Sequence, residues 1–176
     1  MSGNEELSVR IQRLEDIEEI KQLKARYCLY CDGGWPEKSG THAGPIAELF
    51  VEDGEWDGSP GLPAAKGREA IRRLFVDCRN IPFAYHPVTN PIIEVNGDTA
   101  TGNWHLIGVG DMPGGISGFF LGGYEEDYVR TPDGWRYKRM RIYQARQAAI
   151  PGGWGQAPGN ESWGPDLKFE TLTAAS

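Results

Sequence analysis

The sequence is poor in cysteine and has no long apolar run. Its cysteines, Cys28, Cys31 and Cys78, are few and odd in number, which argues against a disulfide framework and predicts a cytoplasmic protein in a reducing compartment. No apolar run approaches the roughly 18 residues that a membrane span needs. The acidic, polar first residues are unlike a secretory signal. We therefore expect no membrane partner.

Basic residues and ligand-type motifs are also scarce. The 18 Lys and Arg residues are outnumbered by 25 Asp and Glu, and the net charge of −7 disfavours nucleic-acid binding. The three histidines show no His-x-x-x-His spacing and the Cys-x-x-Cys pair has no second half, so no metal site is predicted. No glycine-rich phosphate loop and no Gly-x-Ser-x-Gly motif occurs. A function without a cofactor is therefore expected.

Aromatic residues, in contrast, are plentiful. Six Trp, seven Tyr and six Phe suit either a large core or an apolar pocket. A length of 176 residues fits one domain with its own core. We place this domain at 1–147. The tail, 148–176, contains Trp154 and Trp163 without periodicity, and we expect it to dock on its own domain or on a neighbouring subunit.

The first half of the chain has helical patterns. Apolar residues three and four positions apart predict a helix over 9–31, which a Gly-Gly pair ends. A short helix is predicted around 46–50 and a third over 68–79, with a short strand at 55–57 between them. The apolar face of the first helix is expected to consist of Leu14, Ile17, Ile20, Leu23, Tyr27, Cys28 and Cys31.

The second half of the chain has strand patterns. Asn96-Gly97 is the strongest hairpin signal, and Pro132-Asp133-Gly134 marks a second turn. The predicted long strands are 84–95, 98–109, 117–131 and 135–147. Helices first and an antiparallel meander afterwards predict an α+β fold, with helices packed on one face of a curved sheet.

Two residues at the edges of these elements carry the expected chemistry. Asp32 follows the first helix, and His86, in Tyr85-His86-Pro87, opens the first long strand. An Asp that orients and polarises a His makes a general base. Taken singly, Asp32 also fits ordinary turn chemistry, and a His at a strand start is often a satisfied structural residue. The hypothesis therefore depends on whether the two side chains meet.

Strand alternation suggests further candidates. Asn103 and His105 share one strand face, which is turned either to solvent or to a polar cavity. In the last strand, Arg141 has the parity of Trp135 and Tyr137. A basic residue among aromatics binds an anionic group or a carbonyl, unless the row is an exposed ladder.

Four groups of residues keep a distinctive order and spacing over about residues 9–147. They are Ala25-Arg26-Tyr27-Cys28-Leu29-Tyr30-Cys31-Asp32, Leu49-Phe50-Val51-Glu52-Asp53-Gly54-Glu55-Trp56-Asp57, Lys66-Gly67-Arg68-Glu69-Ala70-Ile71, and His86-Pro87 followed by Val95-Asn96-Gly97-Asp98-Thr99-Ala100-Thr101-Gly102 and Arg130-Thr131-Pro132-Asp133-Gly134-Trp135-Arg136. With these motifs the chain resembles the SnoaL-like family of the nuclear transport factor 2-like superfamily. This fold hosts many functions, so the resemblance is specific for the architecture more than for one activity.

The resemblance implies a cone-shaped α+β barrel. In it, a curved antiparallel sheet carries three helices on its concave face and holds an apolar pocket at the open end. The branch that contains scytalone dehydratase, bile-acid dehydratase and hexachlorocyclohexane dehydrochlorinase uses a His–Asp dyad for elimination, without a cofactor. Carried over, the dyad is His86 and Asp32, and the tyrosine five residues before the Asp is Tyr27. The arginine of the last strand matches Arg141, or alternatively Arg139.

These matches give a hypothesis of function. His86 removes a proton, Tyr27 hydrogen-bonds the substrate oxygen, and Arg141 stabilises negative charge. The leaving-group acid of the dehydratases has no clear counterpart, and Asn103 or His105 is the candidate replacement. Dehydration of a small hydrophobic ring is preferred over isomerisation and dehydrohalogenation. The expected substrate-binding residues are Trp56, Phe75, Phe83, Asn103, His105, Phe119, Phe120 and Tyr124.

A non-catalytic function is the alternative. The chain would then be a ligand-binding module, or a small subunit like that of an oxygenase, which shares this fold. On family grounds we expect a homodimer or homotrimer, formed through the outer face of the sheet or through the tail.

Overall fold

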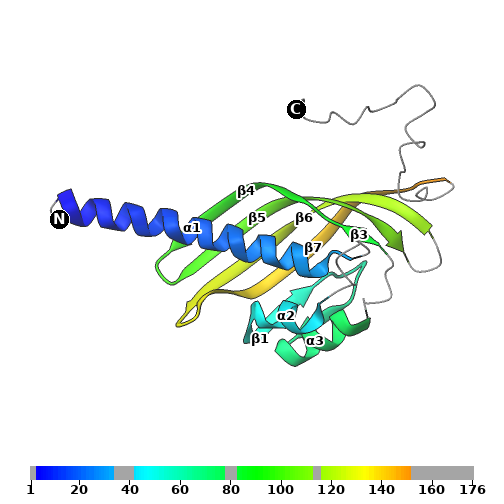
Figure 1. Cartoon of the computed structure of the whole chain (residues 1–176), viewed down its shortest axis with the longest axis horizontal. Coiled ribbons are helices and arrows are strands. Elements are labelled where there is room, and N and C mark those ends of the chain that lie inside the picture. The colour runs from blue at the N-terminus through cyan, green and yellow to red at the C-terminus, as the bar shows by residue number, and fades with distance from the viewer. Residues whose placement is uncertain (1–2, 34–41, 78–82, 113–115, 152–176) are drawn as a thin grey trace, which may run out of the picture.

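The computed structural model describes residues 3–33, 42–77, 83–112 and 116–151, and consists of three helices and one sheet (Figure 1). The helices are α1 (Gly3–Cys31), α2 (Ala43–Glu48) and α3 (Arg68–Asp77). The strands are β1 (Phe50–Asp57), β2 (Ala64–Lys66), β3 (Ala84–Tyr85), β4 (Val88–Asn96), β5 (Thr99–Met112), β6 (Ile116–Thr131) and β7 (Gly134–Ala149). The three predicted helices and the meander of long strands are confirmed.

The sheet is mixed and open. Its order is β2-β1-β7-β6-β5-β3, and β4 also pairs with β5. β1 runs parallel to β7, with Asp57 opposite Arg141, and the other pairs are antiparallel. The expectation of a purely antiparallel sheet is therefore wrong in this one pair. β1 and β7 are far apart in the chain, so no hairpin turn fixes their relative direction.

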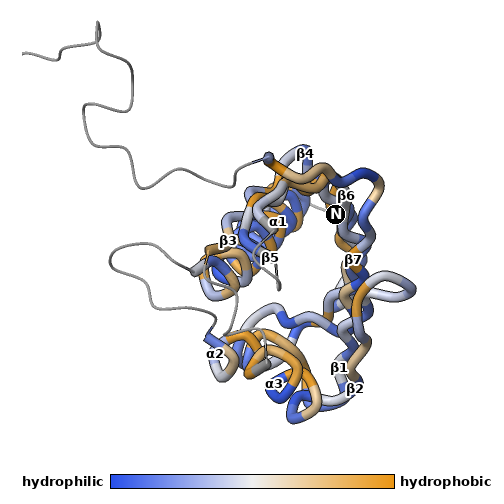
Figure 2. Tube along the Cα trace, turned by 90° about the vertical axis from the view of Figure 1, so that its right-hand side faces the viewer, coloured by the Kyte–Doolittle hydropathy of each residue, from blue (hydrophilic) through white to orange (hydrophobic). Residues whose placement is uncertain are grey.

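The sheet curves around the helices. Viewed along the long axis, the strands bend from β4 through β6 and β7 to β1 and β2, and the helices lie inside the bend (Figure 2). This arrangement confirms the cone-like α+β architecture with three helices on the concave side. It also brings the C-terminal end of α1 close to β3, since these two elements are in contact.

Helix α1 is longer than predicted and buries a different set of residues. It starts at Gly3, and its buried positions include Asp16, Ile20, Leu23 and Lys24. Leu14, which was expected in the core, is 67% exposed. The carboxylate of Asp16 takes the inward position, and its burial is compensated by hydrogen bonds at 2.7 Å from Arg130 and at 3.2 Å from the indole of Trp135.

The core combines an apolar cluster with one internal ion pair. Lys24 Nζ lies 2.5 Å from Glu126 Oε1, and both side chains are fully buried. The ammonium also lies 3.0 Å from the centre of the Tyr124 ring, as a cation–π contact. The most buried apolar residues around this pair are Ile20, Leu23, Ile46, Phe50, Ile71, Leu106, Tyr137 and Met140.

The predicted tail falls mostly outside the described residues. β7 continues to Ala149, two residues past the predicted end of the domain at 147. Trp154 and Trp163 are not among the residues that the structure describes, so the docking of the tail stays a prediction. In the part of the chain that is described, no helix has the length and apolar character of a membrane span.

Candidate active site

Asp32 is positioned by the end of α1. Its backbone N–H donates to Cys28 O at 2.9 Å, which completes the last helical turn. The next residue, Gly33, exchanges two backbone hydrogen bonds with Ala84 of β3, at 3.2 and 3.1 Å. This short bridge ties the helix end to the sheet and turns the Asp32 side chain, which is 11% exposed, into the protein.

His86 lies at an interruption of the sheet edge. β3 and β4 both pair with β5, and His86-Pro87 separates them. Proline has no N–H for the ladder and disfavours helical backbone in the residue before it. The break releases His86 from regular pairing, and its side chain turns inward, with the residue 8% exposed.

The two candidate residues meet. His86 Nδ1 lies 2.5 Å from Asp32 Oδ1, and the backbone N–H of His86 donates to the same oxygen at 3.1 Å. Two contacts to one carboxylate oxygen fix the plane of the imidazole. They also assign Nδ1 to the carboxylate, which leaves Nε2 as the nitrogen that exchanges protons. The arrangement therefore has the orienting geometry of a general acid–base pair.

The electrostatics of the dyad favour the imidazolium. Burial alone lowers the pKa of His86, but the hydrogen bond that its imidazole donates to Asp32 and the contacts with the thiols of Cys28 and Cys31 outweigh this effect, so the net pKa lies well above the ordinary value. The pKa of the Cys31 thiol is raised by burial, against the opposing effect of His86. The sequence did not reveal these thiol contacts, although their i, i+3 spacing before Asp32 places them on one side of the helix end.

Tyr27 lies one turn before the dyad, in contact with it. Its ring meets the His86 ring edge-on, with centroids 6.0 Å apart. The indole N–H of Trp56 donates to the Tyr27 oxygen at 2.9 Å. Burial raises the pKa of Tyr27 well above its ordinary value, so the phenol stays protonated and remains a hydrogen-bond donor.

Aromatic side chains surround Tyr27. Phe75 packs edge-on against both Tyr27 and Trp56, at 6.2 and 5.6 Å between centroids, and the Tyr124 ring lies 6.1 Å from that of Tyr27. Trp56, Phe75 and Tyr124 are each at most 6% exposed, so they form the apolar wall behind the phenol. Phe120 belongs to the same concave face, because its ring covers Gly108 where a Cβ would clash. Phe83 is half-buried just before β3.

Three expected pocket residues lie on the convex face instead. Asn103 and His105 alternate with buried Trp104 and Leu106, and both are exposed. His105 Nδ1 lies 3.0 Å from the Asn90 amide, outside the cone. Phe119 is 44% exposed, and the register pairs it with Val109 rather than with an inward residue. The sequence left open whether Asn103 and His105 face solvent or a cavity. In the structure both side chains face solvent.

Arg141 is also separated from the dyad, and the cause is a bulge. The β6–β7 register shifts between Asp127 and Tyr128, so one extra residue of β7 is accommodated there. The shift reverses the phase of the strand: Tyr137 is buried, but Arg141 turns outward and pairs with Glu125 at 3.1 Å. Arg139, the alternative, likewise approaches Asp127 at 3.9 Å. A strict period of two cannot reveal such a slip.

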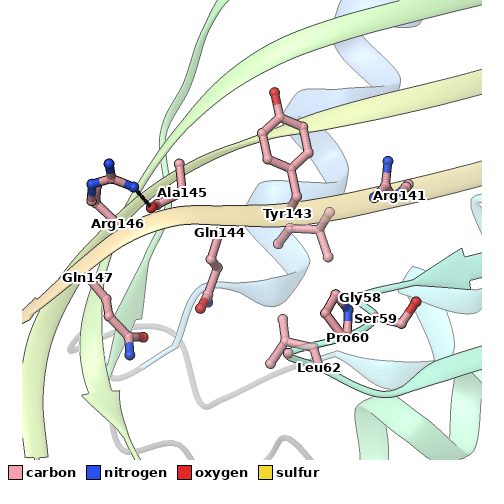
Figure 3. Close-up of a pocket in the computed structure, with 12 residues that line it drawn as sticks. Gly58, Ser59, Pro60, Leu62, Arg141, Tyr143, Gln144, Ala145, Arg146 and Gln147 are labelled. Carbon is pink, nitrogen blue, oxygen red and sulfur yellow. Dashed lines mark hydrogen bonds between the residues drawn. The ribbon is translucent and has the colours of Figure 1, made fainter.

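A groove runs along the edge of β7, beyond its pairing with β1. It has a volume of about 450 Å³ and lies between the loop Gly58–Leu62 and residues 141–147 of β7 (Figure 3). Leu62 and Gln144 approach it from opposite sides in that view. Neither member of the dyad lines this groove. Residues 34–41 and 78–82 lie outside the described residues.

Comparison with known proteins agrees with this architecture. Residues 12–141 match the model of the SnoaL-like domain. An NTF2-like protein with a cystatin-like fold from Novosphingobium aromaticivorans is 33% identical over 82% of this chain and 91% of that chain, with a TM-score of 0.68. None of the curated protein sequences matches this chain.

Two more distant structures share the fold. A scytalone dehydratase-like protein from N. aromaticivorans is 21% identical, over 78% of this chain and 89% of that one, with a TM-score of 0.66. A hexachlorocyclohexane dehydrochlorinase from Novosphingobium barchaimii is 20% identical, over 85% and 99% of the two chains, with a TM-score of 0.71. Because the family model covers most of the chain, the protein belongs to the SnoaL-like family of the nuclear transport factor 2-like superfamily.

Proposed function

We propose that this protein is a cofactor-independent enzyme whose His86–Asp32 dyad abstracts a proton from a small hydrophobic ring substrate, with dehydration as the preferred reaction. The observation that carries the proposal is the buried contact of 2.5 Å between His86 Nδ1 and Asp32. A carboxylate at Nδ1 holds the imidazole in one tautomer and orientation, which is what a general base requires.

The dehydration proceeds through named atoms. The base is the neutral imidazole of His86, whose population grows as the pH rises towards the raised pKa of this residue. Its Nε2 takes the proton from the carbon next to a carbonyl, and the electron pair of that C–H bond forms the new C=C bond. The C–O bond to the β-hydroxyl breaks, and the hydroxide leaves as water with the proton from the imidazolium. Tyr27 donates to the carbonyl oxygen as negative charge develops there. The aromatic wall of Trp56, Phe75 and Tyr124 suits an apolar ring.

The family relationship supports an enzyme of the lyase type. The structural relatives include a scytalone dehydratase-like protein and a dehydrochlorinase, and each of these names describes an elimination. Both reactions need a base that removes a proton next to the departing group. The buried dyad of this chain supplies such a base, and the identity of the leaving group depends on the pocket.

Deuterium exchange tests the proposal without knowledge of the leaving group. A panel of one- and two-ring cyclic ketones is incubated in D₂O, and exchange at the α-carbon is followed by NMR and mass spectrometry. We expect the wild type to catalyse exchange, and His86→Ala and Asp32→Asn to reduce it on the order of 10³-fold or more. His105→Ala is the matched control, because His105 is exposed on the convex face and should leave exchange unchanged.

Two outcomes would contradict the proposal. Near-normal exchange in His86→Ala would show that the His86–Asp32 dyad is not the base that removes the proton. Ligands that raise the melting temperature of the wild type without any exchange or elimination would instead support the non-catalytic binding module.

A further inference from the structure

The N-terminal part of α1 extends beyond the sheet (Figure 1). We call residues 3–15 the arm, because all of them are exposed while buried positions begin at Asp16. The whole helix has 29 residues and a length of about 43 Å. An isolated stretch of three to four turns is marginally stable in water, so the arm gains most from a packing partner.

The arm carries an apolar stripe on the side that faces away from the domain. Leu7, Ile11 and Leu14 are 53%, 46% and 67% exposed. Their i, i+4, i+7 spacing keeps them within an arc of about 60° on the helix. Asp16 and Ile20, which contact the domain, lie on the opposite side at about 180°. The domain of the same chain therefore does not cover the stripe.

The end of β7 lies far from the stripe. The described chain ends at Pro151, just past β7, and this end of β7 lies at the end of the molecule opposite to the arm (Figure 1). A second copy of the chain, in contrast, brings an identical stripe. We infer that two copies of this protein associate by pairing their arms antiparallel, with Leu7, Ile11 and Leu14 of each helix in the contact.

Charge complementarity supports a second copy in this orientation. On a helical wheel, Glu6, Arg10 and Arg13 all lie on the same side of the stripe. Antiparallel helices bring the same sides together, so Glu6 of one copy meets Arg10 and Arg13 of the other. No ion pair within the described part of the chain involves these three residues. The antiparallel arrangement also keeps the two sheets at opposite ends.

The small size of the contact sets its strength. Three side chains from each copy form an interface below the standard size, so the association is expected to be weak, on the order of micromolar. Beyond Leu14 the same helix face continues with Glu18 and Lys21. These two side chains form an ion pair, with 3.7 Å between Lys21 Nζ and Glu18 Oε2. These polar residues limit the pairing to the arm.

Sedimentation equilibrium of the full chain from about 5 to 500 μM tests the inference. We expect a concentration-dependent dimer, and the variant Leu7→Glu/Ile11→Glu/Leu14→Glu should raise the dissociation constant at least about tenfold. Glu is a good helix former, so circular dichroism should stay close to wild type. Ile107→Glu/Phe119→Glu/Leu121→Glu is the matched control, since it places an equal charge on the exposed convex face.

The opposite results would overturn the inference. A wild type that is monomeric throughout, a dimer that survives the triple change, or a dimer lost only in the convex-face control would each reject arm pairing. Charge reversal tests the orientation. Glu6→Arg should weaken the dimer, and adding Arg10→Glu and Arg13→Glu should restore it; absence of restoration would reject the antiparallel arrangement.

Discussion

The contact between His86 and Asp32 makes a prediction that needs no substrate. Asp32→Asn removes the negative charge beside Nδ1 but keeps a side-chain oxygen that can still accept the backbone N–H of His86, now at 3.1 Å. The change therefore isolates the interaction with the imidazole. Burial lowers the pKa of His86, and in this variant the hydrogen bond to the Asp32 carboxylate no longer opposes that effect. The pKa of His86 should fall from well above its ordinary value to below that value.

The same substitution changes stability in a pH-dependent way. A charge-assisted hydrogen bond contributes about 1.5–3 kcal/mol, and one unit of pKa corresponds to about 1.4 kcal/mol. Because the pKa of His86 is raised in the folded state, this stabilisation is complete below the pKa of the unfolded chain and is lost as the pH rises through the folded value. Wild type should therefore exceed Asp32→Asn in unfolding free energy by about 2 kcal/mol near pH 6, and by less at alkaline pH.

NMR titration of the imidazole protons measures the pKa directly. His86→Gln assigns the His86 signal, and the variant Asp32→Asn is compared with wild type under the same conditions. Urea unfolding at several pH values measures the stability difference. A His86 titration that is unchanged in Asp32→Asn would refute the claim that the carboxylate controls the imidazole, and the catalytic proposal would lose its physical basis.

Three further predictions follow from buried groups and from the bulge. Tyr137→Phe should raise the unfolding free energy by about 1 kcal/mol, since the Tyr137 hydroxyl is buried without a hydrogen-bond partner among the described residues; Tyr128→Phe, which loses bonds to Glu126 and from an indole, should lower it in the same urea assay. Lys24→Met should cost about 3–5 kcal/mol by removing the cation that faces the buried Glu126 side chain, and adding Glu126→Gln should recover most of this loss; equal stability of both variants would contradict the reasoning. Arg141→Ala should change turnover less than about threefold, because it lies outside the cone, and a loss comparable to that of His86→Ala would mean that the bulge is misassigned.

Much of the fold could be predicted from local patterns. The 3.6-residue and two-residue periods fixed the helices and the long strands, because one face of each element must be apolar. The Asn-Gly pair located the β4–β5 hairpin, and Gly97 has the positive φ of 60° that this turn requires. The parallel partner of β7 was missed, because a pairing between residues 57 and 141 leaves no trace in either segment.

The candidate site divides in the same way. Sequence patterns singled out Asp32 and His86, since an Asp at a helix end and a His before a Pro are visible locally, whereas Tyr27 was implied only by the family resemblance. They failed for Arg141, because a single bulge exchanges the two faces of a strand. They also gave no sign that Lys24 is fully buried, since a lysine in a helix is ordinarily solvated and only a partner from a distant strand makes its burial tolerable.

The sequence alone determined which segments become helix or strand and which side chains were available for proton transfer. Those properties depend on spacing along the chain, so they are encoded within a few residues of each position. Only the tertiary structure decided which of those side chains converge. Convergence depends on the Gly33–Ala84 bridge, which joins residues far apart in the chain, and on the phase of β7, which is set by its register against β6. Neither is encoded in the residues of a single element.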